Sequence, residues 1–228
     1  MATEYTLSLN DLLKDRLPEL PGVVRSVAAR ELRLAMREFF EKTFAWTATI
    51  KDVSVPTGET GIQFTDGDDN TEVIAVLGVA IGNSTEGYTP LVSLAGRPID
   101  EDTTSVNPTH WYITSNPDEI VLYPYLDTAT SDDITAHVAL IPAFDAANGD
   151  DALPRQITLK YYDAIMDGFL ARLYDQPQKP YSNPTKAMQK RHNFVRAMGY
   201  YASQRKNGYN GTPNWRFPNN WQVARGGR

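Results

Sequence analysis

The 228-residue sequence contains no cysteine, and this absence excludes several kinds of chemistry at once. Disulfide bonds, thiolate metal sites and cysteine nucleophiles all need the missing thiol. No run of about eighteen apolar residues occurs, so no membrane-spanning helix is expected. The first five residues lack the basic and apolar segments of a signal peptide, which favours synthesis inside the cell.

Motifs for phosphate and metal chemistry are also missing. Neither a Walker-type nor a dinucleotide-type glycine loop occurs, and no histidine has a partner at zinc-ligand spacing. Residues 66–70 have the alternating oxygen side chains of a calcium loop. However, Thr71 stands where that loop needs glycine and Leu77 where it needs a bidentate acid, so a hairpin turn is favoured.

The nearest approach to a catalytic pair is Glu38 and Glu41, three residues apart on a predicted helix. A glycosidase needs two carboxylates held across a sugar, one of them with a raised pKa. Acidic residues on a helix surface are normally solvated instead. We therefore predict no catalytic residue, no cofactor and no metal ligand, and expect that the protein is not an enzyme.

Acidic residues are absent from the last 53 residues of the chain. Residues 176–228 carry ten basic side chains, whereas residues 1–175 carry 28 acidic and 12 basic ones, a balance of −16. Because opposite charges steer approach, a chain polarised in this way is expected to bind a partner through its basic end. Nucleic acid and an acidic protein groove would both fit this charge.

The final segment, 207–228, combines basic residues with aromatic ones. A disordered tail is normally poor in aromatic residues, and tryptophan beside arginine is typical of interface anchors. We therefore expect an extended arm that docks on another subunit; the alternative is an arm that folds back on its own domain. The residues predicted to make the contact are Tyr209, Trp215, Arg216, Phe217, Trp221, Arg225 and Arg228.

Helical and strand patterns occupy different parts of the chain. Apolar residues at helical spacing predict a short helix and three long ones, over 7–17, 23–44, 157–174 and 183–206. In the last helix, the apolar stripe that faces the core is predicted to be Met188, Val195, Met198 and Ala202. Alternating β-branched segments separated by turn signals predict strands over 47–55, 61–64, 72–81, 91–94, 110–114, 119–123 and 134–141.

This order of elements predicts an α+β fold. The N-terminal helix and two C-terminal helices would form a bundle from residues 1–46 and 152–206. Residues 47–151 would form an inserted antiparallel β-domain of the sandwich or barrel-like kind. Residues 207–228 would be the extended C-terminal docking arm.

Three motifs together resemble the head–tail adaptor proteins of tailed bacteriophages, the ring-forming connectors beneath the portal. The first, AMREFFEKTFAW at 35–46, closes the first long helix and enters the β region. The second is YYDAIMDGFLARLY at 161–174, and the third is the turn QPQKPYSNP at 176–184. The resemblance covers about residues 20–205, and the proline-rich turn is its most specific part.

The resemblance implies a structural virion protein that joins the portal to the tail. Its partners would be the portal protein, a downstream tail or nozzle protein, and further copies of itself in a dodecameric ring. DNA would pass through the channel without sequence-specific binding, and no membrane would be involved. Assembly would take place in the host cytoplasm, and the protein would lie at the head–tail interface of the virion.

Within such a connector, the C-terminal segment would reach into clefts between portal subunits, which suits the basic arm. The acidic part of the chain could give the channel a negative lining that repels DNA phosphates. Two other functions stay open. One is a nucleic-acid-binding module that uses the basic C-terminal region, with an affinity that falls steeply with salt. The other is a peptidoglycan-cleaving tail accessory factor, although no catalytic pair is identifiable.

Overall fold

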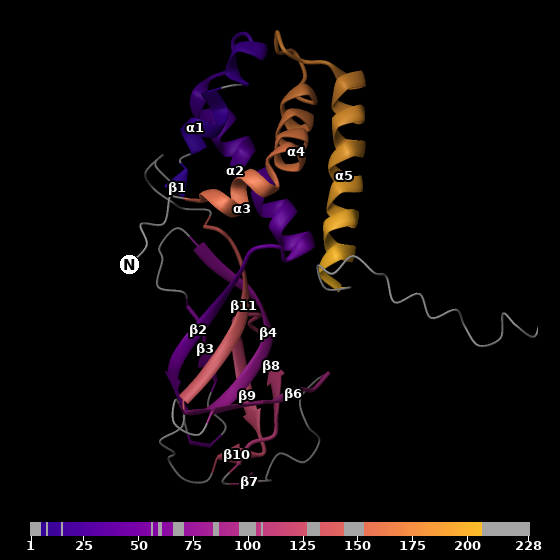
Figure 1. Cartoon of the computed structure of the whole chain (residues 1–228). Helices are drawn as coiled ribbons and strands as arrows, with labels where there is room; N and C mark the ends of the chain where they lie inside the picture. Colours follow the sequence, from indigo (N-terminus) through magenta and orange to yellow (C-terminus); the bar gives the residue numbers. More distant parts are fainter. Residues whose placement is uncertain are drawn as a thin grey trace, which may run out of the picture.

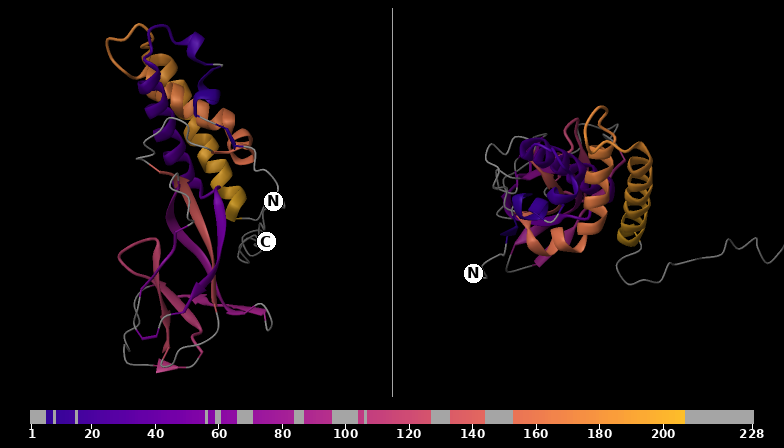
Figure 2. Two further views of the ribbon diagram at one scale, coloured as in Figure 1. Left: turned by 90° about the vertical axis from the view of Figure 1, so that its left-hand side faces the viewer. Right: turned by 90° about the horizontal axis from the view of Figure 1, so that it is seen from above.

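The structure is a computed structural model that describes residues 6–7, 9–14, 16–55, 57–58, 61–65, 71–83, 87–95, 104–105, 107–126, 133–143 and 153–206. The molecule is elongated, with the helices and the short strand β1 gathered at one end and the long strands at the other (Figures 1 and 2). We call these ends the helical half and the β half. The chain therefore belongs to the α+β class, as predicted.

The helical half contains five α-helices and one 3-10 helix within the described residues. They are α1 (Leu9–Lys14), η1 (Leu17–Glu19), α2 (Arg25–Thr43), α3 (Arg155–Lys160), α4 (Tyr162–Tyr174) and α5 (Pro184–Lys206). Helices α2, α4 and α5 pack against one another. The helices predicted over 23–44 and 183–206 are confirmed to within two residues at either end.

The buried side of α2 follows the predicted apolar stripe. Its members, repeated every three or four residues, are Ala28, Leu32, Ala35, Met36, Phe39 and Phe40. The helix ends at Phe44, whose φ of 47° is left-handed and whose N–H donates to the carbonyl oxygen of Phe40. This backbone cap turns the chain out of the helix and into the first long strand.

One predicted helix is two in the structure, because Tyr161 separates α3 from α4. The ring of Tyr161 is buried, with its centroid 5.2 Å from that of Phe39 and 4.8 Å from that of Tyr201. Aromatic pairs at such distances stabilise a core by about 0.5–1.5 kcal/mol each beyond their area burial. The prediction of one continuous helix was wrong because the apolar spacing continues across the break.

The β half contains two four-stranded sheets. In the first, the order is β2 (Thr47–Ser54), β11 (Asp133–Pro142), β4 (Thr71–Asn83), β5 (Gly87–Pro90), and every neighbouring pair is antiparallel. In the second, the order is β3 (Ile62–Gln63), β9 (Glu119–Tyr123), β8 (His110–Ile113), β6 (Val92–Ser93). Two short pairs complete the strands, β1 (Thr6–Leu7) with β12 (Leu153–Pro154) and β7 (Thr104–Ser105) with β10 (Tyr125–Leu126).

The predicted hairpin over 110–114 and 119–123 is confirmed, with β8 and β9 antiparallel and His110 opposite Tyr123. The expectation of a wholly antiparallel β region is wrong in part, since β6 pairs with β8 in parallel and β7 pairs with β10 in parallel. A parallel pair needs a crossover of about a dozen residues or more, and residues 94–109 supply that length between β6 and β8. The described strands close into no barrel.

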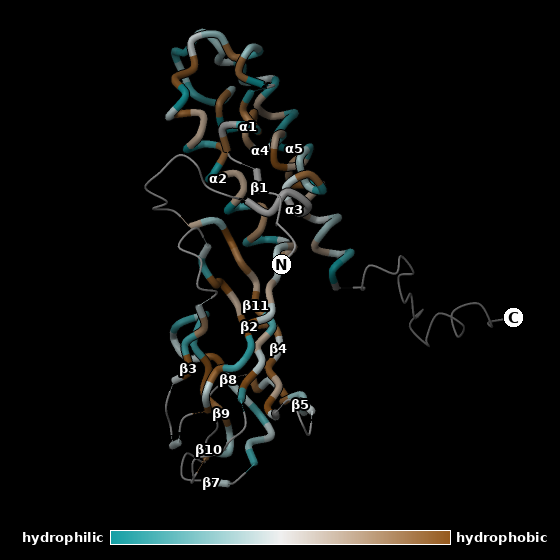
Figure 3. Tube along the Cα trace, turned by 60° about the vertical axis from the view of Figure 1, so that its left-hand side comes forward, coloured by the Kyte–Doolittle hydropathy of each residue, from teal (hydrophilic) through white to brown (hydrophobic). Residues whose placement is uncertain are grey.

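The larger of two hydrophobic clusters among the described residues runs through both halves, and the smaller one, around Tyr112, Val121 and Tyr125, lies in the β half. Helix α2 passes into β2 within three residues, and the N–H of Leu140 donates to the carbonyl oxygen of Trp46 at 2.9 Å. Arg37 on α2 bonds the carboxylate of Glu72 at 2.8 Å and the carbonyl oxygen of Pro142, both in the first sheet. Figure 3 shows hydrophobic stretches along β11, one of the two inner strands of the first sheet, which contributes Leu140 and Pro142 to these contacts.

Candidate functional site

The seven residues predicted to dock on a partner all lie in 207–228, outside the described residues. They are Tyr209, Trp215, Arg216, Phe217, Trp221, Arg225 and Arg228. The described chain ends at Lys206, the last residue of α5. Helix α5 therefore fixes where this segment begins, and the candidate site is built from α5 and the elements that hold it.

The start of α5 is capped as the sequence predicts. The side-chain oxygen of Asn183 accepts a hydrogen bond from the N–H of Lys186 at 3.0 Å, and Pro184 is the first helical residue. The N–H of Asn183 also donates to the carbonyl oxygen of Tyr174 at 2.9 Å. The proline-rich turn thus reverses the chain sharply and returns α5 alongside α4.

A glycine on α4 sets how closely α5 approaches. Phe194 is fully buried, and a Cβ atom added to Gly168 would lie 2.8 Å from its ring. Real Cβ atoms do not come that close, so the two helices can pack at this distance only because residue 168 has no side chain. The inner side of α5 is completed by Ala187 and Met198, which are also buried.

Charged groups tie α5 to both of the helices it touches. The carboxylate of Glu38 on α2 accepts bonds from Arg172 on α4 at 2.8 Å and from Arg191 on α5 at 2.5 and 2.9 Å. On the α4 side, Lys190 donates to Asp167 at 2.6 Å. One carboxylate therefore links three helices, and we call Glu38, Arg172 and Arg191 the ion triad.

The ion triad keeps Glu38 ionised. Burial opposes ionisation of this carboxyl group, but the hydrogen bonds from Arg191 and Arg172 outweigh burial and hold the pKa of Glu38 below its ordinary value. The same contact with Glu38 raises the pKa of Arg191. A general acid needs a raised pKa, so Glu38 is poorly suited to that role. Glu41 is exposed and lies 3.4 Å from Lys42.

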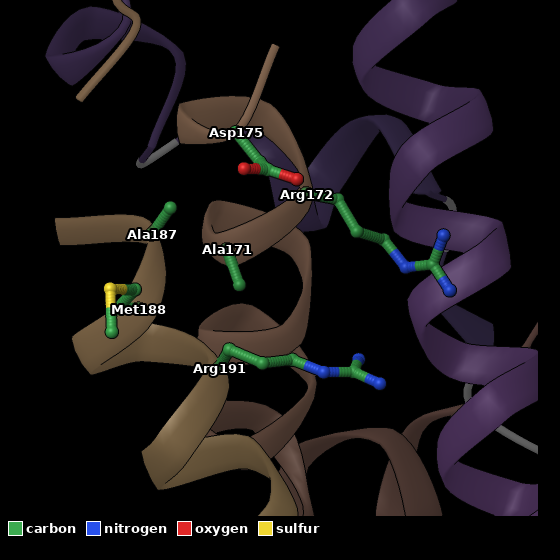
Figure 4. A pocket seen from close by; sticks show the side chains of 6 residues that line it. All are labelled: Ala171, Arg172, Asp175, Ala187, Met188 and Arg191. Carbon is green, nitrogen blue, oxygen red and sulfur yellow. The ribbon is translucent and has the colours of Figure 1, made fainter. Parts of the chain in front are cut away.

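A shallow pocket of about 530 Å³ lies where α4 and α5 meet near the turn (Figure 4). It is lined by Ala171, Arg172, Asp175, Ala187, Met188 and Arg191. Figure 4 shows the side chains of Arg172 and Arg191 both directed toward α2. Both guanidinium groups bond the carboxylate of Glu38, so part of the positive charge at the pocket is already neutralised.

The outer side of α5 corrects one prediction. Met188 and Val195 were predicted to face the core, but they are 77 % and 50 % exposed. Of the predicted stripe, only Met198 is buried, and Ala202 is partly buried. The reason is that Phe194, the bulkiest apolar residue of the helix, packs on Gly168 and rotates the helix so that Met188 and Val195 face outward.

In the part of the chain that the structure describes, no three histidine or acidic residues lie together as a metal site. His110 lies 2.8 Å from the hydroxyl of Thr109, His137 lies 3.5 Å from that of Thr49, and His192 is exposed. The segment 66–70 lies outside the described residues.

None of the helices described here is both long and apolar enough to cross a lipid bilayer.

The sequence model of the SU10 adaptor protein family matches residues 4–216. The chain belongs to this family. The match includes residues 207–216, the first part of the segment after α5, and leaves out 217–228. A search of curated proteins found no match.

Membership of the SU10 adaptor family confirms the resemblance to phage head–tail adaptor proteins that the three motifs indicated. The chain is a structural adaptor protein of phage and thus a virion component. Two of those motifs supply two members of the ion triad, since Glu38 lies in the first and Arg172 in the second, and the third member, Arg191, lies on α5. Sequence reasoning missed the triad, because nothing local indicates that residues 134 and 153 positions apart will meet.

The chain carries its charge unevenly along its length. Residues 47–151 contain 18 acidic and 2 basic residues, whereas residues 1–46 contain 7 of each. Residues 152–175 contain 3 of each. The whole acidic excess of the first 175 residues is therefore carried by residues 47–151, while the basic excess begins in the turn before α5, at Lys179.

Proposed function

We propose that this adaptor forms a homo-oligomeric, dodecameric ring that joins the portal protein to a downstream tail or nozzle protein. The ring would enclose the DNA channel at the head–tail interface, after assembly in the host cytoplasm. The family match over residues 4–216 is the observation that carries the proposal. Ring formation, portal binding and DNA passage are the finer parts that experiment has to test.

In this proposal the chain is divided as its sequence pattern suggests. The helical domain comprises 1–46 and 152–206, and the inserted β domain comprises 47–151. Packing of α2 with α4 and α5 supports a bundle. Buried residues from both four-stranded sheets, among them Val79 and Ile120, share one cluster, which supports a sandwich.

The docking arm in this proposal is 207–228. Its anchors are the aromatic residues Tyr209, Trp215, Phe217 and Trp221, together with Arg216, Arg225 and Arg228. The arm leaves α5, whose residues include no acid, so helix and arm present one sign of charge to an acidic surface of the portal. Charge of one sign raises the rate of encounter, and the buried aromatic rings supply the affinity.

The β domain has the complementary role. Eighteen acids against two bases give it a strongly negative field. In a ring whose channel is lined by this domain, DNA phosphates are repelled and the duplex slides without being held. The contacts of α5 argue against the alternative function of a nucleic-acid-binding module. Lys190 and Arg191 of this basic helix are already bonded to Asp167 and Glu38, so they are less available to bind phosphates.

Removal of the arm tests the proposal. The chain lacking 207–228 and the full chain are each mixed with purified portal protein, and co-sedimentation and negative-stain images are compared. We expect rings on the portal with the full chain and none with the truncated one. Circular dichroism and thermal melting serve to check that the truncated chain still folds.

A matched variant distinguishes the contribution of the aromatic anchors to portal binding from that of the basic side chains. Replacing Trp215, Phe217 and Trp221 by alanine keeps every arginine of the arm. We expect this variant to approach the portal at a similar rate but to dissociate much faster. Full portal binding by the truncated chain would contradict the docking role. Tight, salt-sensitive binding of the full chain to free DNA would favour the nucleic-acid-binding alternative.

A further inference from the structure

Helix α5 has an apolar side that nothing in the described chain covers. Met188 and Val195 are the centre of this side, and Tyr200, which is 58 % exposed, lies at its margin. Met188 and Val195 are seven residues apart, so they lie on the same side of the helix, two turns from each other. The inner side, with Phe194 and Met198, is already packed. A helix that is apolar on two sides is usually buried on both in its assembled state.

Gly199 adds to this pattern. It lies one turn after Val195 on the same side, and a Cβ atom added there would meet nothing within 4 Å. Alanine is the better residue for the interior of a helix, so glycine at an open position weakens the isolated helix. Its position beside an apolar stripe fits a close approach by another helix from outside the chain.

The charges beside the stripe are all basic. His192 and Arg196 are exposed there, and residues 184–206 include no acid. The matching features occur on a different side of the helical half. Leu159 on α3 is 50 % exposed, and Asp163, four residues further along the chain and past the break at Tyr161, is exposed at the start of α4. Figure 1 and the view from above in Figure 2 both show α3 on the side of the helical half away from α5.

We infer that the Met188–Val195 stripe of one copy packs on Leu159 of the next copy, with Arg196 opposite Asp163. The inference rests on the proposed ring and names the surface that builds it. Two different, complementary patches on separate sides of a subunit are what a head-to-tail contact requires, and such a contact gives a ring when the rotation between successive copies closes. Burying Met188 and Val195 between copies removes their apolar surface from water, and the ion pair sets the register.

Cross-linking tests the contact directly, because the chain has no cysteine of its own. Chains with Met188→Cys are mixed with chains with Leu159→Cys, assembled on portal and treated with a short bis-maleimide. We expect a cross-linked pair from the mixture. A chain with both substitutions should give a ladder that extends to the closed ring.

The matched control uses Val92→Cys on β6, which is 59 % exposed and lies in the β half. It should give no product with Leu159→Cys. Rings that form normally while Met188→Cys and Leu159→Cys fail to cross-link would overturn the inference and leave the ring intact. If the unmodified chain forms no ring with portal, the proposed function fails instead. Cross-linking of Met188→Cys to the portal, with none between copies, would assign the stripe to the portal and also refute the inference.

Charge reversal gives a second, independent test. Arg196→Asp and Asp163→Arg should each prevent ring assembly, because each places two like charges opposite one another. The chain that carries both changes should assemble again. Asn193→Asp, on an exposed position of α5 off the stripe, controls for added charge and should assemble normally. Absence of rescue in a doubly substituted chain that melts normally would contradict the pairing of Arg196 with Asp163.

The substitution Gly199→Ala distinguishes an effect of residue 199 on the stability of the chain from an effect on the contact between copies. In the isolated chain it should raise Tm by about 2 °C, since alanine favours the helix. In the assembly it should weaken self-association, because a methyl group enters the contact. A variant that is more stable and assembles as well as the unmodified chain would show that no second copy approaches α5 at this point.

Discussion

The helical half and the β half use charged residues in different ways. In the helical half, residues 1–46 and 152–206 carry 10 acidic and 17 basic side chains, and several of them bond across helices, as in the ion triad and the Lys190–Asp167 pair. In the β half, 18 acids face 2 bases, and the fully buried side chains are mainly aliphatic, such as Ile120, Ile134 and Val138. Charge therefore positions helices in one half, while in the other it gives the surface its electrostatic field.

The largest expected effect concerns the aromatic cluster of the helical half. Phe39 contacts the rings of Phe40, Tyr161, Phe194 and Tyr201, with centroids 5.2–6.3 Å apart. Phe39→Ala should lower the free energy of unfolding by about 3–5 kcal/mol, because it removes a buried ring and leaves a cavity. Urea denaturation measures the loss. Ile134→Val in the β half is the comparison and should cost only about 0.5–1.5 kcal/mol.

The second prediction concerns the close approach of α4 and α5. Gly168→Ala adds a methyl group 2.8 Å from the ring of Phe194, which has to move. Overpacking costs about 1–3 kcal/mol, and the better helix propensity of alanine offsets about 1 kcal/mol of it. We expect a net loss of up to about 2 kcal/mol by urea denaturation. A gain in stability would mean that the two helices separate easily.

The third prediction uses the ion triad and its dependence on pH. Glu38→Gln should cost about 1–2 kcal/mol at pH 7, because two arginines lose a charged partner while solvent screens part of the effect. The pKa of Glu38 is lower in the folded state than in the unfolded state. The stabilisation is therefore fully present above the unfolded pKa and is lost as pH falls through the folded pKa.

The difference in stability between Glu38→Gln and the unmodified chain should accordingly shrink on acidification. Thermal melting at a series of pH values measures it. Glu41→Gln, one turn along the same helix and exposed, is the control and should change stability little at any pH. A constant difference from pH 7 to pH 3 would mean that Glu38 acts through packing and not through its charge.

The smallest effect is expected from the same kind of substitution, an acid replaced by its amide, in the β half. Asp52 is exposed in β2 and has a φ of 59°, a left-handed conformation that asparagine also tolerates. Asp52→Asn should therefore change the free energy of unfolding by less than about 0.5 kcal/mol. A loss as large as that of Glu38→Gln would remove the distinction between the two halves.

Sequence reasoning predicted the elements whose signals are local. The strands around Asn116 and Pro117 and the cap of α5 at Asn183 depend on residues that are neighbours in sequence, and both are confirmed. The break at Tyr161 was missed because the apolar spacing continues through it. The parallel pairing of β6 with β8 was missed because a crossover leaves no local pattern.

The candidate site was predicted less completely. A helical projection of α5 allows either Met188 and Val195 or Ala187 and Phe194 to face inward. Only the missing side chain at Gly168, on another helix, decides between them. The ion triad depends in the same way on residues brought together from three helices. The docking residues of the arm remain a prediction from composition and family resemblance.

The arrangement of α5 has a mechanical consequence. A pull on the segment after Lys206 enters the molecule through α5, which lies beside α4 and joins it through the turn at Asn183. A pull along the helix axis shears Phe194, Lys190 and Arg191 against their partners together, so these contacts share the load. A sideways pull peels the helix away from its C-terminal end and loads the contacts one after another. The adaptor should therefore resist axial tension better than lateral tension.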